Sequence, residues 1–335
     1  MANRFAHIYI EEQARDYTLT ANILKNFPNS IQVGIDNYQE VFHRANQQFV
    51  IQKNHLNLIL AVKKDGLLYA GSPECQDYAN PNFFYTTPVL NCIYDCSYCF
   101  LQGKYSSANI VVFVNQDDFF TAVRQELPKR PDLKKPLFLA LSYDTDLMAT
   151  ENLIPISRDW IEFACSEYDL LVEIRTKSSA FSMLADVQVT DQVLLAWTLS
   201  PQEVIDQYER LTPSLEQRLT AVNKALAAGW HVRICIDPIV YLDNWMEIYA
   251  AFVDKIFMIL PPDKIYDINV GTFRMNATFY RRIKNLRPDS DPYFRLSAKK
   301  GKIITMPEDL RQRMLAMVRK RLSKYLPKSQ IVVWE

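Results

Sequence analysis

Several features that would assign the chain to a special class are scarce or missing. The 335 residues include only seven glycines, with no low-complexity tract and no internal repeat. No stretch reaches about 18 uninterrupted apolar residues, so we expect no transmembrane helix and no membrane partner. The opening residues, MANRFAHIYIEEQARDY, lack a basic stretch followed by an apolar run, so we expect no signal peptide and a cytoplasmic location.

The six cysteines, at positions 75, 92, 96, 99, 165 and 235, do not indicate disulfides. An even number would do so in a small secreted domain, but this chain is large and has no recognisable signal peptide. Three of them lie within eight residues, a spacing that suits disulfide pairing poorly. We interpret Cys92, Cys96 and Cys99 as metal ligands.

Charge is balanced over the whole chain but not along it. The sequence has 38 Lys and Arg and 38 Asp and Glu. Residues 271–335 hold sixteen basic and five acidic residues, a net charge of +11, which leaves −11 for residues 1–270. Such asymmetry can mark a phosphate-rich partner, with a solvated basic helix as the alternative.

Composition and periodicity predict an α/β fold. The chain is 49% hydrophobic and 23% charged, as in globular proteins. From about residue 86, short apolar runs alternate with amphipathic stretches, as in parallel sheets with helical crossovers. The runs predicted as strands are 87–92, 136–142, 170–176, 193–200, 230–237 and 266–273. A helix at 117–127 is capped by Asn115, and another begins after Thr212 and Pro213 and ends at Gly229.

Polar residues on one face of two strands decide between architectures. Arg233, Cys235 and Asp237 alternate with apolar residues, and the run 172–177 shows the same pattern. A strand covered by helices on both faces is apolar throughout. We therefore predict an incomplete (partial) TIM-type parallel β/α barrel of about six strands over residues 86–335, rather than a doubly wound sheet.

Residues 1–85 are predicted to be an N-terminal α+β extension packed on the barrel, to which we assign no chemistry. Strands are expected at 8–14, 47–52 and 56–62, with a helix at 17–26. Near the C-terminus a long helix begins at about Pro307, and 329–335 forms a last strand.

The segment CIYDCSYC, residues 92–99, is a C-x3-C-x2-C triplet directly after the first predicted barrel strand. Active sites of such barrels lie on loops at the carboxyl ends of strands. Three thiolates can hold a [4Fe–4S] cluster and leave one iron open. That iron can chelate S-adenosylmethionine (SAM) and reduce it to a 5′-deoxyadenosyl radical. Structural zinc is the alternative, but it needs a fourth ligand and no second cysteine pair is present.

The loop and its flanks, from Tyr78-Ala79 to Gln102, resemble the spore photoproduct lyase family, radical SAM enzymes that repair a thymine dimer in DNA. A weaker likeness runs from residues 8–11 through 175–177, 237–239 and 273–274 to the C-terminal helix. The resemblance implies a [4Fe–4S] cluster, SAM, DNA as substrate and an electron donor such as flavodoxin or ferredoxin. We expect a monomer.

The resemblance also implies roles for individual residues. Cys92, Cys96 and Cys99 match the cluster ligands. Lys177 matches a lysine that reaches the SAM carboxylate, and its alternative is a surface lysine. Thr198 falls where the family has a serine that contacts SAM, and its alternative is a packing role. Ser142 is also assigned to the SAM site.

On the substrate side, Arg274 matches a family arginine at the substrate mouth, with a structural salt bridge as the alternative. Lys299, Lys300 and Lys302 are predicted to bind the substrate. They lie in or beside the segment 295–300, which corresponds to the lesion-gripping hairpin of the family but lacks its aromatic residue.

The predicted catalytic residues are Tyr98, Tyr143 and Cys235. Tyr143 stands where the family has a cysteine that donates hydrogen to the product radical. Of two tyrosines in the family's hydrogen relay, Tyr98 is kept and the other is Phe100. Tyr143 could quench the radical directly, or Cys235 could replace the missing thiol. The alternative for Cys235 is a small buried hydrophobic residue.

We predict a radical SAM carbon–carbon lyase that acts on a thymine-dimer-type DNA lesion. One alternative is a radical SAM enzyme on another substrate, such as another nucleic acid or a peptide. A second is a non-enzymatic iron–sulfur protein that binds nucleic acid. Uncoupled SAM cleavage under reducing conditions separates the second alternative from the enzymes.

Overall fold

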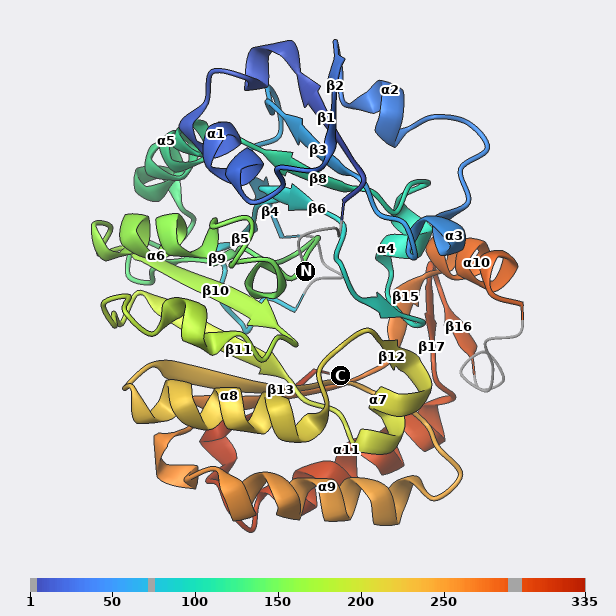
Figure 1. Ribbon diagram of the computed structural model, residues 1–335. Coiled ribbons are helices and arrows are strands. Elements are labelled where there is room, and N and C mark those ends of the chain that lie inside the picture. The colour runs from blue at the N-terminus through green and yellow to red at the C-terminus, as the bar shows by residue number, and fades with distance from the viewer. Residues whose placement is uncertain (1–4, 72–75, 289–296, 335) are drawn as a thin grey trace. The chain divides into compact units, whose positions relative to one another are not determined.

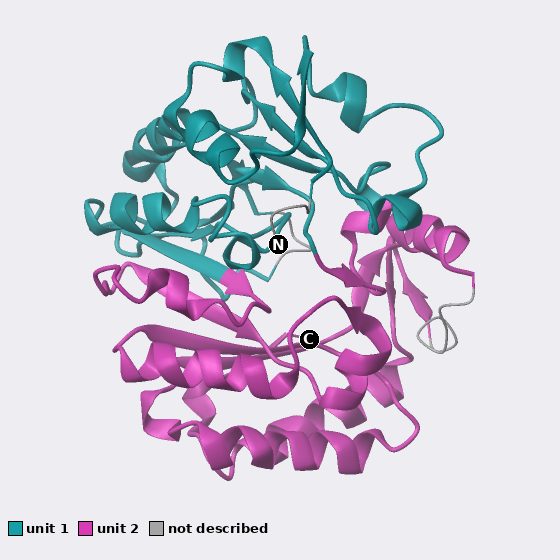
Figure 2. Cartoon of the chain, in the orientation of Figure 1, with its two compact units in different colours: residues 1–93, 104–174 teal, residues 94–103, 175–335 magenta. Residues whose placement is uncertain are grey.

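The computed structural model describes residues 5–71, 76–288 and 297–334 (Figure 1). The chain forms two compact units, coloured separately in Figure 2: residues 1–93 with 104–174, and residues 94–103 with 175–335. The predicted boundary after residue 85 falls inside the first unit. That domain division stays a prediction.

The first unit contains two sets of strands. One is a five-stranded sheet in the order β2-β1-β3-β8-β6, formed by β1 (His7–Glu11), β2 (Ile31–Ile35), β3 (Leu58–Ala61), β6 (Val89–Leu90) and β8 (Ile110–Phe113). Its pairs are parallel except β6 with β8. The other set runs in the order β10-β9-β5-β4, from β4 (Tyr69–Ala70), β5 (Phe83–Tyr85), β9 (Leu137–Ala140) and β10 (Leu170–Thr176), whose last two residues belong to the second unit. Within it, only the pair of β4 with β5 is antiparallel.

The helices of the first unit connect these strands. They are α1 (Thr18–Lys25), α2 (Gln39–Phe42), α3 (Phe49–Gln52), α5 (Gln116–Glu126) and α6 (Ser157–Cys165). Asn115 is the N-cap residue of α5, as predicted, although its side chain makes no capping hydrogen bond. Trp160 of α6 is fully buried and donates from its indole nitrogen to Gln116 at 2.8 Å.

The second unit is built on four parallel strands in the order β18-β14-β13-β11. They are β11 (Val193–Thr198), β13 (His231–Ile239), β14 (Asp267–Thr272) and β18 (Ile331–Trp334). Every residue of β11 and β14 is buried. Two small antiparallel sheets join β7 (Asp95–Cys96) to β12 (Glu209–Arg210), and β15 (Arg274–Asn276) to β17 (Ile303–Thr305) and β16 (Ala298–Lys300).

The helices of the second unit are α4 (Leu101–Lys104, which ends at the unit boundary), α7 (Gln202–Tyr208), α8 (Leu215–Ala227), α9 (Trp245–Ile259), α10 (Ala277–Leu286) and α11 (Glu308–Leu322). The start of α8 is set by a capping box between Ser214 and Gln217, not by Thr212 as predicted. Gly229 follows its end with φ of 91°, a conformation that glycine adopts without strain.

Most strand predictions are confirmed: the runs at 136–142, 170–176, 193–200, 230–237 and 266–273 form β9, β10, β11, β13 and β14. The strand predicted at 8–14 ends at Glu11, because Glu12–Ala14 form a 3-10 helix after β1. Two further predictions are wrong. In the run 47–52, predicted as a strand, Phe49–Gln52 form helix α3, with Phe49 buried and Ile51 exposed. The run 87–92 contributes only β6, which pairs antiparallel in the five-stranded sheet and does not begin the barrel. Short apolar runs carry too few periods to distinguish helix from strand, or one sheet from another.

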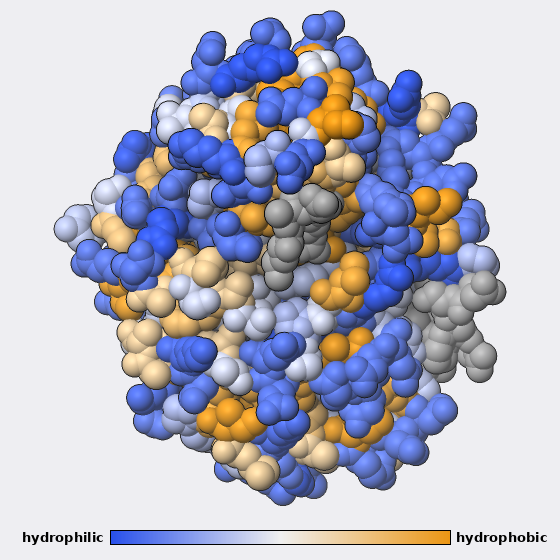
Figure 3. Space-filling model, in the orientation of Figure 1, coloured by the Kyte–Doolittle hydropathy of each residue, from blue (hydrophilic) through white to orange (hydrophobic). Residues whose placement is uncertain are grey.

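The exposed surface is mainly hydrophilic on the face drawn in Figure 3, where hydrophobic residues are scattered among polar ones. Among the described residues, no helix has the length and apolar character needed to cross a membrane.

Candidate functional site around the cysteine loop

The cysteine loop is held in the second unit by a buried carboxylate. Asp95 is 2% exposed and accepts hydrogen bonds from Arg210 Nε at 2.9 Å and from Arg287 Nη2. Strands β7 and β12 pair Asp95 with Arg210 and Cys96 with Glu209. A buried charge held by two arginines is costly to unpair, so these contacts fix the backbone around Cys96.

The end of the loop is fixed as tightly. Gln102 donates from Nε2 to the carbonyl oxygen of Cys96 at 2.7 Å, and Arg287 Nε donates to Gln102 Oε1. Gly103 packs directly on Phe279, because a Cβ at that position would lie 2.5 Å from the Phe279 Cα. Only glycine fits this approach of the loop to α10.

The three motif cysteines are divided between the units, with Cys92 in the first and Cys96 and Cys99 in the second. All three are free of disulfides: Cys96 is buried, and the other two are half-buried. The Cys99 amide donates to the Cys96 carbonyl at 3.0 Å. Within residues 5–71, 76–288 and 297–334, no three Cys, His, Asp or Glu side chains are grouped to hold a metal ion. The reduced thiols of one short, anchored loop are the donor type that a [4Fe–4S] cluster requires, and their ligand role stays a prediction.

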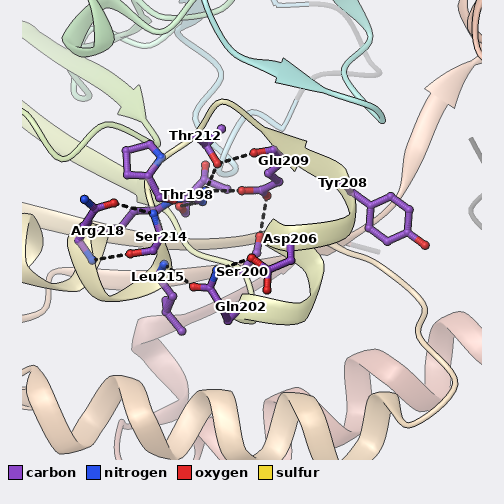
Figure 4. A network of polar contacts seen from close by, with 12 residues as sticks. Thr198, Ser200, Gln202, Asp206, Tyr208, Glu209, Thr212, Ser214, Leu215 and Arg218 are labelled. Carbon is purple, nitrogen blue, oxygen red and sulfur yellow. Dashed lines mark hydrogen bonds and ion pairs between the residues drawn. The ribbon is translucent and has the colours of Figure 1, made fainter.

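Glu209 is the centre of a buried polar network that sequence reasoning missed (Figure 4). Its carboxylate accepts from the Tyr98 hydroxyl, from Ser200 Oγ at 2.8 Å and from Arg218 Nη2 at 2.5 Å. The side chains of Glu209 and Arg218 have no solvent exposure. The network therefore joins the cysteine loop, through Tyr98, to the end of β11 and to α8.

The charges of the network hold Glu209 ionised. Burial raises the pKa of this carboxyl, but the neighbouring Lys177 and Arg218 cations and the Tyr98 hydrogen bond outweigh burial and lower it. The pKa of the Tyr98 phenol is well above its usual value, because of burial and because Glu209 and Cys96 lie near it. Tyr98 is consequently a protonated donor in this site.

Lys177 directly follows the last residue of β10 and is half-buried. Its Nζ lies 5.5 Å from the centroid of the Tyr98 ring. Burial lowers the pKa of Lys177, but Glu209, Cys96 and Cys99 act in the opposite direction and raise it overall. The lysine is thus a cation beside two motif cysteines, and not a lysine of an exposed loop.

Thr198 and Cys235 are register partners on the neighbouring strands β11 and β13. They are 3% and 0% exposed. The carbonyl oxygen of Thr198 accepts from Arg218 Nη1 at 3.2 Å, which ties this strand end to the Glu209 network. Their predicted roles in SAM binding and hydrogen donation stay predictions, since both positions also suit packing.

Ser142, Tyr143 and Asp144 follow β9 in the first unit. Within the described part of the chain, the buried hydroxyl oxygen of Ser142 has no hydrogen-bond partner. Asp144 is 1% exposed and accepts from Lys104 Nζ and the Tyr105 hydroxyl, both at 2.7 Å to Oδ2. The carboxyl end of β9 thus combines a polar group available to a ligand with a firmly anchored backbone.

Arg274 forms an ion pair with Asp237, in agreement with the structural alternative for this residue. Its Nη1 lies 3.1 Å from Asp237 Oδ1, and its guanidinium lies 4.9 Å from the centroid of the Trp334 ring. Arg175 Nη1 is 3.8 Å from the same carboxylate. Burial raises the pKa of Asp237, but the two arginines outweigh it and lower it overall. A role for Arg274 towards substrate stays a prediction.

The hairpin lysines lie on the sheet that contains Arg274. Lys299 and Lys300 belong to β16 and Lys302 follows the turn at Gly301, and all three are exposed. Arg274 pairs with Thr305, which in turn pairs with Ala298, so β17 separates Arg274 from the lysine strand. Arg295 and Leu296, part of the predicted hairpin, lie outside the described residues.

Sequence reasoning missed the residues that hold the cysteine loop in the second unit, namely Glu209, Arg218 and Arg287, and it missed Asp144, which anchors the segment after β9. Tyr98 and Glu209 are 111 positions apart, and Asp95 and Arg287 are 192 apart. No local pattern relates residues at such separations. The one available signal was Asp95 itself, the charged residue of the cysteine motif, because a buried carboxylate requires basic partners.

Comparisons with known proteins identify the family and the fold. The sequence model described as "Spore photoproduct lyase" matches residues 4–332. The chain is 26% identical over 306 residues to the spore photoproduct lyase of Clostridium acetobutylicum, covering 87% of this chain and 84% of that protein. It is 25% identical over 265 residues to that of Bacillus subtilis, covering 78% and 75%. A solved structure of a spore photoproduct lyase variant with bound AdoMet and dinucleoside spore photoproduct superposes with a TM-score of 0.83 at 18% identity, covering 99% of each chain. The predicted fold class, a partial parallel β/α barrel, is confirmed by this likeness.

Proposed function

The chain belongs to the spore photoproduct lyase family, and from this premise we propose that it repairs a thymine-dimer-type lesion in DNA by radical SAM chemistry. The family consists of radical SAM lyases that carry a [4Fe–4S] cluster, so the predicted enzyme class and cofactors are confirmed at the family level. The observation that carries the proposal is the family match over residues 4–332, which includes the complete C-x3-C-x2-C triplet.

Cys92, Cys96 and Cys99 would hold the cluster, which when loaded supplies the electron that cleaves SAM. The residues around the cysteines have distinct roles in the proposed site. Asp95, with its two arginines, orients the loop backbone. Lys177 supplies a half-buried positive charge suited to the carboxylate of SAM, and Glu209 positions that lysine through its opposite charge.

We also assign Ser142 and Thr198, each at or after the end of a strand, to SAM binding. The Ser142 hydroxyl has no partner among the described residues, so it can bind a polar ligand group without losing an internal hydrogen bond. Thr198 lies at the last position of β11, where its backbone is fixed by Arg218.

Two observations support DNA as the substrate: the ligand of a solved relative and the exposed lysines of this chain. The solved relative carries a dinucleoside spore photoproduct. In this chain, Lys299, Lys300 and Lys302 are exposed on one hairpin, as phosphate contacts require. The lesion need not be spore photoproduct itself, because Tyr143 replaces the hydrogen-donor cysteine implied by the family resemblance.

The test is anaerobic reconstitution with iron, sulfide and SAM, followed by incubation with irradiated or intact DNA and analysis of the digested products. We expect 5′-deoxyadenosine from the reduced enzyme, and loss of a thymine dimer only from irradiated DNA. Defined oligonucleotides containing spore photoproduct or a cyclobutane dimer identify the lesion. SAM cleavage without repair of either lesion would contradict the DNA proposal and leave the radical SAM class intact.

A second candidate function is the same chemistry on another substrate, such as a different nucleic acid or a peptide. The specific observation that favours it is Tyr143 at the hydrogen-donor position, because a changed donor alters how the product radical is quenched. Membership of a family of enzymes favours both enzymatic functions over a non-enzymatic iron–sulfur binder.

A further inference from the structure

Three tyrosines of the first unit form a continuous stack that begins at Tyr143. The Tyr143 and Tyr85 rings lie 4.2 Å apart between centroids with planes 26° apart. The Tyr85 and Tyr69 rings lie 5.0 Å apart with planes 16° apart. The chain therefore places three phenols in ring-to-ring contact.

The secondary structure fixes this stack. Tyr69 and Tyr85 are directly opposite each other on the antiparallel strands β4 and β5. Tyr85 pairs in register with Ala140 of β9, and Tyr143 follows three residues later. Gly66, at φ of 64°, leaves the space that the Tyr69 hydroxyl occupies, since a Cβ there would lie 2.1 Å from that oxygen. The hydroxyl of the outer tyrosine therefore lies in the space left by the missing side chain of Gly66.

Packing alone does not require the hydroxyl groups. In the same group of strands, Phe83 and Phe138 stack at 5.7 Å with planes 26° apart, which shows that phenylalanine serves this sheet as a packing residue. Exposure also changes along the stack: Tyr143 and Tyr85 are half-buried, whereas Tyr69 is 36% exposed. The three phenols thus run from the site residue after β9 to the solvent.

Two lysine ammonium groups lie over the rings at the ends of the stack and affect how these tyrosines can be oxidised. Lys104 Nζ lies 5.8 Å from the Tyr143 ring centroid, and Lys63 Nζ lies 5.4 Å from the Tyr69 ring centroid. A positive charge over an aromatic face opposes formation of a second positive charge on that ring. Oxidation of these tyrosines is therefore favoured as a neutral phenoxyl radical, with loss of the proton together with the electron.

We propose that Tyr143, Tyr85 and Tyr69 form a radical relay that ends each catalytic cycle. The inference rests on the proposed radical function. Tyr143 gives the hydrogen atom of its O–H bond to the carbon radical of the product, so a C–H bond forms and Tyr143 becomes a phenoxyl radical. An electron then passes from Tyr85 to Tyr143, which takes up a proton as Tyr85 releases one, and the same exchange follows between Tyr69 and Tyr85. At the exposed Tyr69, a protein one-electron reductant and a proton from water restore the phenol.

The relay can be tested in the full chain without cluster or SAM. Tyr143 is replaced by 3-aminotyrosine, which loses an electron more easily than tyrosine and traps an arriving oxidation. A flash-generated ruthenium(III) tris-bipyridine complex oxidises the protein from solvent, and electron paramagnetic resonance detects the aminotyrosyl radical. We expect this radical in the parent for this experiment, the chain with 3-aminotyrosine at position 143. The radical should be lost when Tyr85→Phe or Tyr69→Phe is added, because these substitutions keep the rings but remove the hydroxyl groups. Tyr168→Phe, at a tyrosine 89% exposed outside the stack, is the control and should change nothing. Equal radical yields in the parent and both stack variants would overturn the relay.

A second measurement uses the reconstituted enzyme with SAM, damaged DNA and a protein electron donor. Tyr85→Phe and Tyr69→Phe should complete a first turnover and then stall, with a phenoxyl radical that accumulates at the inner end of the stack. Sustained turnover in both variants at the parent rate would count against the relay. Absence of repair by the parent enzyme would instead contradict the proposed function, while the aminotyrosine experiment would still decide the relay.

Discussion

The phenol of Tyr98 donates a hydrogen bond to the carboxylate of Glu209, and neither side chain is exposed by more than 8%. This one contact links the cysteine loop to the ion pair of Glu209 with Arg218. The residue between two motif cysteines is thus anchored to the interior of the second unit. Protein contacts alone therefore hold the backbone of this loop in place.

Substitution of Glu209 by glutamine should strongly destabilise the unloaded protein. Arg218 would then be a buried cation without its counter-charge, a change that costs about 3–5 kcal/mol. Tyr98→Phe removes only one hydrogen bond to a charged group and should cost about 1.5–3 kcal/mol. Urea unfolding measures both values, with Tyr168→Phe expected within about 0.5 kcal/mol of the parent. Similar stability of Glu209→Gln and the parent would show that the network does not anchor the loop.

Replacing Cys92, Cys96 or Cys99 singly by alanine should abolish the cluster. The anaerobically reconstituted parent is expected to be brown and to contain about four irons per chain. The control is Cys165→Ala, because Cys165 is exposed and outside the motif. Iron and sulfide analysis with visible absorbance decides the outcome. Stoichiometric zinc in a colourless, anaerobically purified parent would assign the thiols to a structural site.

Lys177→Ala should weaken SAM binding while iron content stays at the parent level. The lysine addresses only a carboxylate, and loss of a charged hydrogen bond worth about 1.5–3 kcal/mol lowers affinity roughly 10- to 100-fold. Calorimetric titration of SAM into the reconstituted protein measures the change. Lys224→Ala, at an exposed lysine of α8, is the matched control. If SAM affinity is the same in both variants, Lys177 is not part of the cofactor site.

The barrel strands and the cysteine motif could be predicted from sequence because both are local patterns. Strands such as β10 and β14 are long enough to show their apolar character, and the three cysteines lie within eight residues. The two-residue strand β6 has no period from which its sheet could be read. Residues 47–52 were misassigned for the same reason, since one turn of helix and a short strand share their apolar content.

The partners of the site could not be predicted because they depend on tertiary structure. Glu209 follows a short helix and contributes to a strand of two residues, so nothing nearby in the sequence marks it as a counter-charge. Lys177 was identified by its position after a strand, but its raised pKa arises from groups that lie more than thirty residues away along the chain. The stack of Tyr69, Tyr85 and Tyr143 likewise depends on strand order and register.

The ion pair of Asp237 with Arg274 should make stability depend on acid pH. Because the folded-state pKa of Asp237 is below its usual value of 3.8, the pair stabilises the fold fully above pH 3.8 and loses this effect as pH falls through the lowered pKa. The difference in unfolding free energy between the parent and Asp237→Asn should be constant near neutral pH and shrink below pH 3.8. Urea titrations across this range measure it, with the exposed Asp263→Asn as control. A difference that is independent of pH would exclude the titration of Asp237 as its cause.

The hairpin lysines should determine how DNA binding responds to salt. Lys299, Lys300 and Lys302 are exposed within four positions of one another, and each phosphate contact releases a condensed counterion. Replacing all three by alanine should weaken binding to single- and double-stranded oligonucleotides and reduce the log–log salt slope by about one for each lost contact. Fluorescence anisotropy at several salt concentrations gives both quantities.

A matched triple variant separates the hairpin from net charge. Lys25, Lys64 and Lys134 are exposed lysines of the first unit, so their replacement by alanine removes the same total charge from other surfaces. The control should keep the parent slope. Lysines that do not contact a phosphate release no counterion on binding, so their removal leaves the number of released counterions unchanged. Cluster content and uncoupled SAM cleavage should be unchanged in both triple variants, since none of the six lysines belongs to the proposed cofactor site. Equal salt slopes for the two variants would attribute binding to overall charge. Phosphate contacts are strong at about 50 mM salt, so no binding by the parent under that condition would direct the search to a peptide or small-molecule substrate.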